Sequence, residues 1–138
     1  MIRKKEITAQ EHRALALWAA DCAEHVLPYF EREYPRDKRP RKAIEACRKW
    51  ARTGIFRMAD VRSTSLAAHA AARGAKDDAA RFAARSAGQA IAVAHAPGHA
   101  IAAAWYAAKA AGAAANANES KWQLRRLPKR LVAKLKRS

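Results

Sequence analysis

Two carboxylates and an imidazole lie close together early in the sequence, in the run Asp21-Cys22-Ala23-Glu24-His25. On a helix, residues three and four positions apart project from one face, so Asp21, Glu24 and His25 would be neighbours in space. Carboxylates and imidazoles serve as metal ligands and as general acid–base groups. The same residue types also form ion pairs on a helix surface beside a partly buried histidine, and we favour this second interpretation.

A second group consists of His95 and His99, which flank Pro97 and Gly98. Histidines at this spacing on an unbroken helix can share a metal ion. Pro97 and Gly98 interrupt the helical register that would aim both rings at one point. We therefore expect the imidazoles to bond backbone carbonyls that the proline frees, and we keep a metal site as the weaker alternative.

A third group of polar side chains lies on alanine-rich segments, where it could line a groove or link helices. It comprises His69, Arg73, Arg85 and Gln89. Because a buried polar group needs a hydrogen-bond partner, we predict that Asp21, His25 and His69 join in one hydrogen-bond network between helices. The rival hypothesis is a metal site that uses Asp21, Glu24, His25 and His69 together with His95 or His99.

Other catalytic templates are missing from the sequence. The glycines are isolated, so there is no phosphate-binding loop, and no serine has the context of a nucleophile elbow. Cys22 and Cys47 have no metal-type spacing and are too few for a disulfide scaffold, so we interpret them as small core residues. We predict no catalytic residue and no cofactor.

The elements that must position these groups are all helices. Thr8 and Glu11 have the spacing of a capping box, and large apolar residues then recur at helical spacing as far as Tyr29. Pro28 should kink or restart this helix. Further helices are predicted from Pro40 to Gly54, from 58 or 60 to 73, from 77–78 onward, after 98, and in the basic segment that Pro128 interrupts.

No segment alternates in the manner of a strand. We predict an all-α fold, a compact antiparallel bundle of about five to seven helices with alanine-rich packing. Trp18, Trp50 and Trp105 are expected in one core. The chain of 138 residues suits a single helical domain over 1–138, with its core at about 8–127 and a basic C-terminal helix or tail at about 119–138.

The charge of the chain is strongly positive, with 28 Lys and Arg against 12 Asp and Glu and a formal net charge of +16. Such a surplus favours nucleic acid or another acidic partner, although a GC-rich genome also enriches arginine and alanine without selection. Missing frameworks for base readout leave non-specific contact as the most that charge supports. The candidate phosphate or partner contacts are Arg125, Arg126, Lys129, Arg130 and Lys134.

The sequence offers no secretory signal and no membrane span. The N-terminus is charged, and the longest run of low charge, 86–108, is mostly alanine and is broken by His95, Pro97 and His99. We therefore expect a cytoplasmic protein without membrane contact, and the sequence leaves its oligomeric state open.

The order of these features resembles a known family. The runs are 17–27 (LWAADCAEHVL), 34–35 (YP), 39–46 (RPRKAIEA), 67–73 (AAHAAAR) and 87–90 (AGQA), followed by His95 and His99. Together, over roughly residues 10 to 127, they resemble the bacterial putative immunity proteins of the helical immunity-five-like group, which gene neighbourhood links to polymorphic toxin systems.

The resemblance implies a single-domain helical protein that binds and neutralises a cognate toxin without catalysis. The alternative that the charge supports is a nucleic-acid-associated basic helical protein. A metal-dependent enzyme built on Asp21, Glu24 and the histidines is the hypothesis that the residues favour least.

Overall fold

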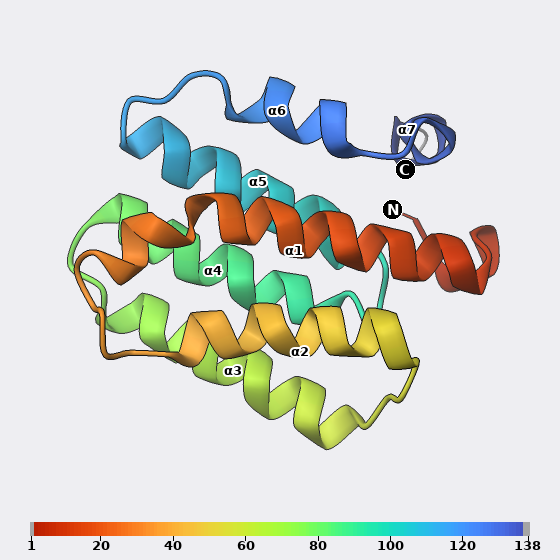
Figure 1. Ribbon diagram of the computed structural model, residues 1–138, viewed down its shortest axis with the longest axis horizontal. Helices are drawn as coiled ribbons and strands as arrows, with labels where there is room; N and C mark the ends of the chain where they lie inside the picture. The colour runs from red at the N-terminus through yellow and green to blue at the C-terminus, as the bar shows by residue number, and fades with distance from the viewer. Residues whose placement is uncertain (1, 137–138) are drawn as a thin grey trace.

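The computed structural model describes residues 2–136, which form helices joined by short connections (Figure 1). Met1, Arg137 and Ser138, including the end of the predicted basic tail, lie outside the described residues. A short 3-10 helix at Lys4–Glu6 precedes seven α-helices: α1 (Ala9–Glu31), α2 (Arg39–Thr53), α3 (Met58–Gly74), α4 (Asp78–Ala92), α5 (His99–Ala113), α6 (Glu119–Arg126) and α7 (Lys129–Lys136). No strand occurs in 2–136, and the predicted all-α bundle is confirmed.

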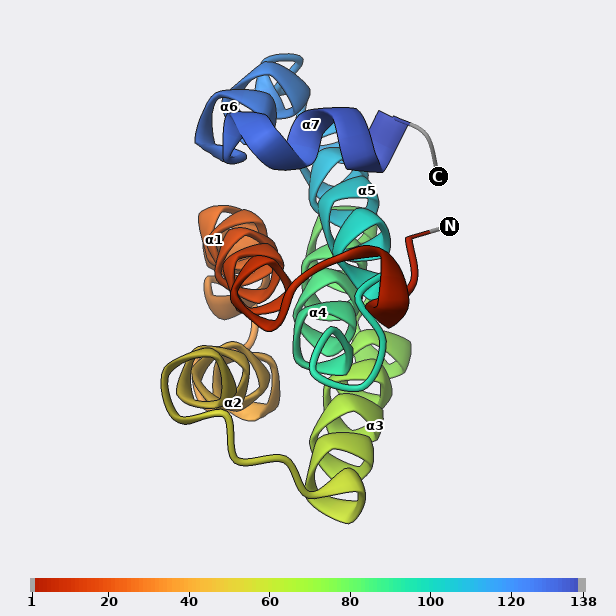
Figure 2. The same ribbon diagram turned by 90° about the vertical axis from the view of Figure 1, so that its right-hand side faces the viewer.

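Helix α4 is the centre of the fold and packs against α1, α2, α3 and α5. Figure 2 shows α3, α4 and α5 stacked in one layer, α1 and α2 in a second layer beside it, and α6 and α7 across the top. Small side chains allow neighbouring helices to approach closely. The buried face of α4 is made almost entirely of them: Ala80, Ala83, Ala84, Ser86, Ala87, Gly88 and Ala90, with Ile91 as the one large residue.

Local signals placed several helix ends correctly. At the start of α1, the Thr8 hydroxyl accepts from the Glu11 N–H and the Glu11 carboxylate accepts from the Thr8 N–H, which confirms the capping box. Gly54 ends α2 with a φ of 71°, a left-handed conformation that costs glycine little. Asp77 caps α4 by accepting from the Ala80 N–H at 2.7 Å.

The two prolines behave differently. Helix α1 continues through Pro28 and ends at Glu31, so the proline does not restart it. Pro28 is exposed and lies in the last turn of α1. Few helical hydrogen bonds therefore remain beyond it that the proline could disturb. Pro128 does separate α6 from α7, as predicted.

The prediction that three tryptophans share one core is wrong for Trp105. Trp18 is buried, and Trp50 packs against the edge of the core, but Trp105 is 54% exposed. Helix α5 buries its alanine face instead, through residues such as Ala103, Ala107 and Ala110. Helices that meet through methyl groups leave no room for an indole, so Trp105 stays on the outer face.

In 2–136, no helix is both long and apolar enough to cross a bilayer.

Candidate functional site

Asp21 and Glu24 on α1 lie beside arginines from other helices. The Arg48 guanidinium on α2 donates to Asp21 at 2.8 Å and to Glu24 at 3.0 Å. Arg126 on α6 donates to the other Asp21 oxygen at 3.1 Å. Both carboxylates are therefore held in ion pairs that join α1 to α2 and α6.

His25 has a separate partner on α6. Its Nδ1 lies 2.5 and 2.8 Å from the two carboxylate oxygens of Glu119, within hydrogen-bond distance of both. Glu119 is 3% exposed, and Trp122 stacks on the imidazole with ring centroids 3.7 Å apart. The pair attaches α6 to α1 beside an open hollow of about 360 Å³ lined by Asp21, Glu24, His25, Pro28, Trp122 and Arg126.

The predicted network of Asp21, His25 and His69 is wrong. His69 on α3 accepts at Nδ1 from Arg85 on α4 at 3.0 Å. Helices α3 and α1 both pack against the central helix α4, which lies between them. His69 on α3 therefore does not reach Asp21 on α1. Burial, together with the nearby cations Arg85 and Arg73, lowers the pKa of His69 to about 4, and the ring is neutral at pH 7.

His95 and His99 do not act together either. His95 is exposed in the turn before Pro97, whereas His99 begins α5 and donates from Nδ1 to the Gln89 side-chain oxygen at 2.7 Å. His99 therefore bonds a side chain and not the backbone carbonyl that we expected. Of the two roles considered for the polar groups on the alanine-rich segments, a groove lining or a link between helices, this bond and the His69–Arg85 bond support the link. Nowhere in 2–136 do three or more His, Cys, Asp or Glu side chains gather as a metal site would require.

Part of the positive charge of the basic C-terminal segment lies in ion pairs within the molecule. Lys134 donates to Glu11 on α1 at 2.7 Å, and Arg130 lies 4.0 Å from the same carboxylate. Together with Arg126, three of the five candidate contacts thus bind acids of α1. Arg125 and Lys129 are exposed, and neither makes an ion pair with any described residue.

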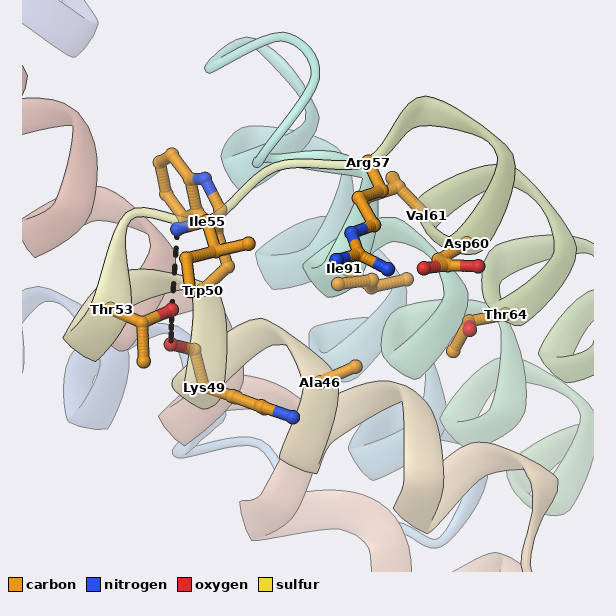
Figure 3. Close-up of a pocket in the computed structure, with 10 residues that line it drawn as sticks. All are labelled: Ala46, Lys49, Trp50, Thr53, Ile55, Arg57, Asp60, Val61, Thr64 and Ile91. Carbon is orange, nitrogen blue, oxygen red and sulfur yellow. Dashed lines mark hydrogen bonds between the residues drawn. The ribbon is translucent and has the colours of Figure 1, made fainter.

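A second concave surface lies elsewhere, between α2 and α3, and the sequence did not indicate it. It is a pocket of about 370 Å³. Trp50 of α2 and Val61 of α3 form its walls, Ile91 of α4 lies at its base, and Ile55 projects beside it (Figure 3). Because these side chains come from three helices and a loop, no local spacing brings them together.

The loop at the mouth of the pocket has a defined conformation. Gly54 turns the chain, and the Arg13 guanidinium occupies the space where a side chain at position 54 would lie. The Ile55 N–H donates to the Thr53 hydroxyl at 3.2 Å, and this hydroxyl donates to the Lys49 carbonyl at 2.9 Å (Figure 3). These bonds hold Ile55 outward with 66% of its surface exposed.

Trp50 is supported from behind by His12 of α1. The two ring centroids are 4.7 Å apart, and His12 Nε2 donates to the Val93 carbonyl at 2.6 Å. Burial lowers the pKa of His12, and the nearby Lys4 ammonium lowers it further, so both favour the neutral ring. In contrast, the indole N–H of Trp50 has no acceptor among residues 2–136.

Cations surround this mouth. Lys49 and Arg57 line the pocket, Arg13 packs against Gly54, and the Lys4 ammonium lies 5.8 Å from the centroid of the Phe56 ring. Among residues 2–136, Asp60 is the only acid that lines it. Within the described residues, neither Lys49 nor Arg57 makes an ion pair.

One sequence signal could have pointed here: Ile55, Phe56 and Met58 are large apolar residues in and beside a short loop, and all three are exposed.

Comparison with known proteins identifies a family whose model covers most of the chain. The family model described as "Imm-5 like putative immunity protein" matches residues 5–130. No curated protein and no solved structure matches the chain.

Proposed function

This chain belongs to the Imm-5 like putative immunity protein family, and we propose that it acts without catalysis by binding a cognate protein toxin in the cytoplasm. We further propose that the pocket between α2 and α3, with the exposed loop beside it, is the contact surface.

The exposure of Ile55 beside the Trp50 pocket is the observation that carries this proposal. Protein interfaces centre on apolar and aromatic groups that a partner desolvates, with polar groups at the rim. Here Ile55 is exposed and its backbone N–H is held by the Thr53 hydroxyl, the neighbouring Phe56 is also exposed, and Trp50 is half-buried beside them. A preorganised surface of this kind loses little freedom on binding, which supports a role in tight association.

The geometry of the earlier catalytic candidates supports a binding role as well. Asp21 and Glu24 are held by Arg48, and Glu119 holds His25. Each of these side chains is thus engaged in a contact between helices. We therefore assign these residues to the attachment of α2 and α6 on α1.

Co-purification with the toxin encoded beside this gene, followed by titration calorimetry, tests the proposal. We expect a complex of defined stoichiometry, and we expect Ile55→Asp to weaken it by roughly thirtyfold, the effect of losing about 2 kcal/mol at an interface hot spot. Leu124→Asp on α6 is the matched control, since Leu124 is 57% exposed and lies far from the pocket. Absence of a complex, or equal affinity of the two variants, would contradict the proposal.

The exposed and unpaired Arg125 and Lys129 favour a second candidate function, non-specific binding of nucleic acid. Its test is fluorescence polarisation with a duplex at several salt concentrations. A nucleic-acid binder would give a log–log slope of about −0.9 per phosphate neutralised, and Arg125→Glu with Lys129→Glu would flatten this slope. Affinity that does not change with salt would exclude the second candidate.

A further inference from the structure

We infer that the pocket between α2 and α3 receives an acidic polypeptide segment that inserts one large apolar side chain and places carboxylates against Lys49 and Arg57. The inference rests on the proposed function only for the identity of the partner as a toxin. The chemistry of the segment follows from the pocket itself.

The apolar part of the pocket selects the anchor. Trp50, Val61 and Ile91 come from three different helices and together line a pocket whose whole volume is about 370 Å³, within the usual range of ligand pockets. In a duplex the bases are stacked inside, and the exposed phosphates and sugars have no large apolar group to place in this space, so a polypeptide fits this surface better than duplex nucleic acid.

The polar groups of the pocket select the flanking residues. Lys49 on α2 and Arg57 just before α3 stand on opposite walls of the mouth (Figure 3). The Trp50 indole N–H adds a donor that no described residue satisfies. Donors thus outnumber the one carboxylate, Asp60, and a segment rich in acceptors would satisfy them.

The surrounding field points the same way. Arg13 and Lys4 lie beside the loop, and the whole chain carries a formal net charge of +16. Complementary charge raises the association rate and disfavours wrong partners. A basic segment would meet like charges around the mouth, whereas carboxylates on both sides of an apolar anchor would meet cations on both walls.

A displayed library of random twelve-residue peptides, panned against the full chain in the presence of excess duplex DNA, tests the inference without knowledge of the toxin. We expect enriched peptides to carry an aromatic or large aliphatic residue flanked by Asp or Glu. A labelled copy of such a peptide should lose affinity about tenfold when Lys49→Glu and Arg57→Glu are combined. The matched control combines Arg125→Glu and Lys129→Glu, which changes the net charge equally at a remote surface.

A charge exchange makes the test specific. A peptide with its acids replaced by lysine should bind the Lys49→Glu, Arg57→Glu variant better than the wild-type chain. Enrichment of basic or uncharged peptides only, no enrichment at all, or equal binding to both double variants would each overturn the inference. Displacement of the peptide by duplex DNA alone would instead assign the surface to nucleic acid and also overturn it.

Failure of this inference can be told apart from failure of the proposed function. If the toxin is still bound by the Lys49→Glu, Arg57→Glu variant with unchanged affinity, the chain binds a toxin through another surface. If acidic peptides are selected and the neighbouring toxin is not bound, the pocket has the inferred chemistry and the proposed function is wrong.

Discussion

Replacement of Gly88 with alanine probes the closest approach of α3 and α4. A Cβ at this position would lie 2.7 Å from Nε2, 2.9 Å from Cε1 and 3.0 Å from Cδ2 of the His69 ring. The backbone is also tied at this point, because the Ser65 hydroxyl donates to the Gly88 carbonyl at 2.9 Å. The methyl group can be accommodated only if the imidazole moves or the two helices separate.

Two opposing effects decide the sign. Alanine is better than glycine inside a helix by about 0.8–1 kcal/mol. Overpacking costs about 1–3 kcal/mol, and displacement of His69 from Arg85 adds roughly 0.5–1.5 kcal/mol for the lost hydrogen bond. We therefore expect Gly88→Ala to lower the free energy of unfolding by about 0.5–3.7 kcal/mol, although alanine alone would raise it.

Urea unfolding followed by circular dichroism measures this effect. Gly112→Ala is the matched control, because no atom lies within 4 Å of a Cβ at that position in α5, and it should be stabilising by up to about 1 kcal/mol. In a His69→Ala background the clash is removed, so Gly88→Ala should become stabilising as well. If Gly88→Ala stabilises the wild-type chain as Gly112→Ala does, the close packing of α3 on α4 is wrong.

Three further predictions concern titratable groups. His69 has a pKa lowered to about 4 from its ordinary 6.5, so the unfolded chain binds the proton more tightly. The stabilisation from neutral His69 is therefore complete above about pH 6.5 and is lost as the pH falls toward 4. In His69→Gln, the free energy of unfolding measured in urea should change less between these pH values, by roughly 1–2 kcal/mol after solvent screening is allowed for. The same pH dependence in the variant and the wild type would contradict this prediction. Glu119→Ala should cost about 1–3 kcal/mol and speed tryptic cleavage in α6, whereas exposed Glu33→Ala should match the wild type; equal cleavage rates would refute the role of the His25 pair. Burial raises the pKa of both Cys22 and Cys47, the latter to about 12, so a thiol reagent at pH 8 should label the unfolded protein only; rapid native labelling would show that the thiols are accessible.

The sequence by itself determined the fold class and several of the positions where helices begin or end. The Thr8–Glu11 box, the Gly54 cap and the Asp77 cap each depend on groups within four residues of one another, and all three are present. The family could also be recognised from the sequence, because the order of short sequence runs along the chain does not depend on how the helices pack.

Only the tertiary structure decided which side chains are buried and which distant residues contact one another. In an alanine-rich helix such as α5, small residues occur on every side, so the period of apolar residues does not mark the buried face, and Trp105 was misplaced for this reason. His25 pairs with Glu119, which is 94 positions away along the chain, and α4 separates His69 from α1. The pocket likewise depends on the way α2, α3 and α4 meet. Contacts between distant segments follow from how closely helices can pack, a property of the assembled bundle that spacing within one helix does not encode.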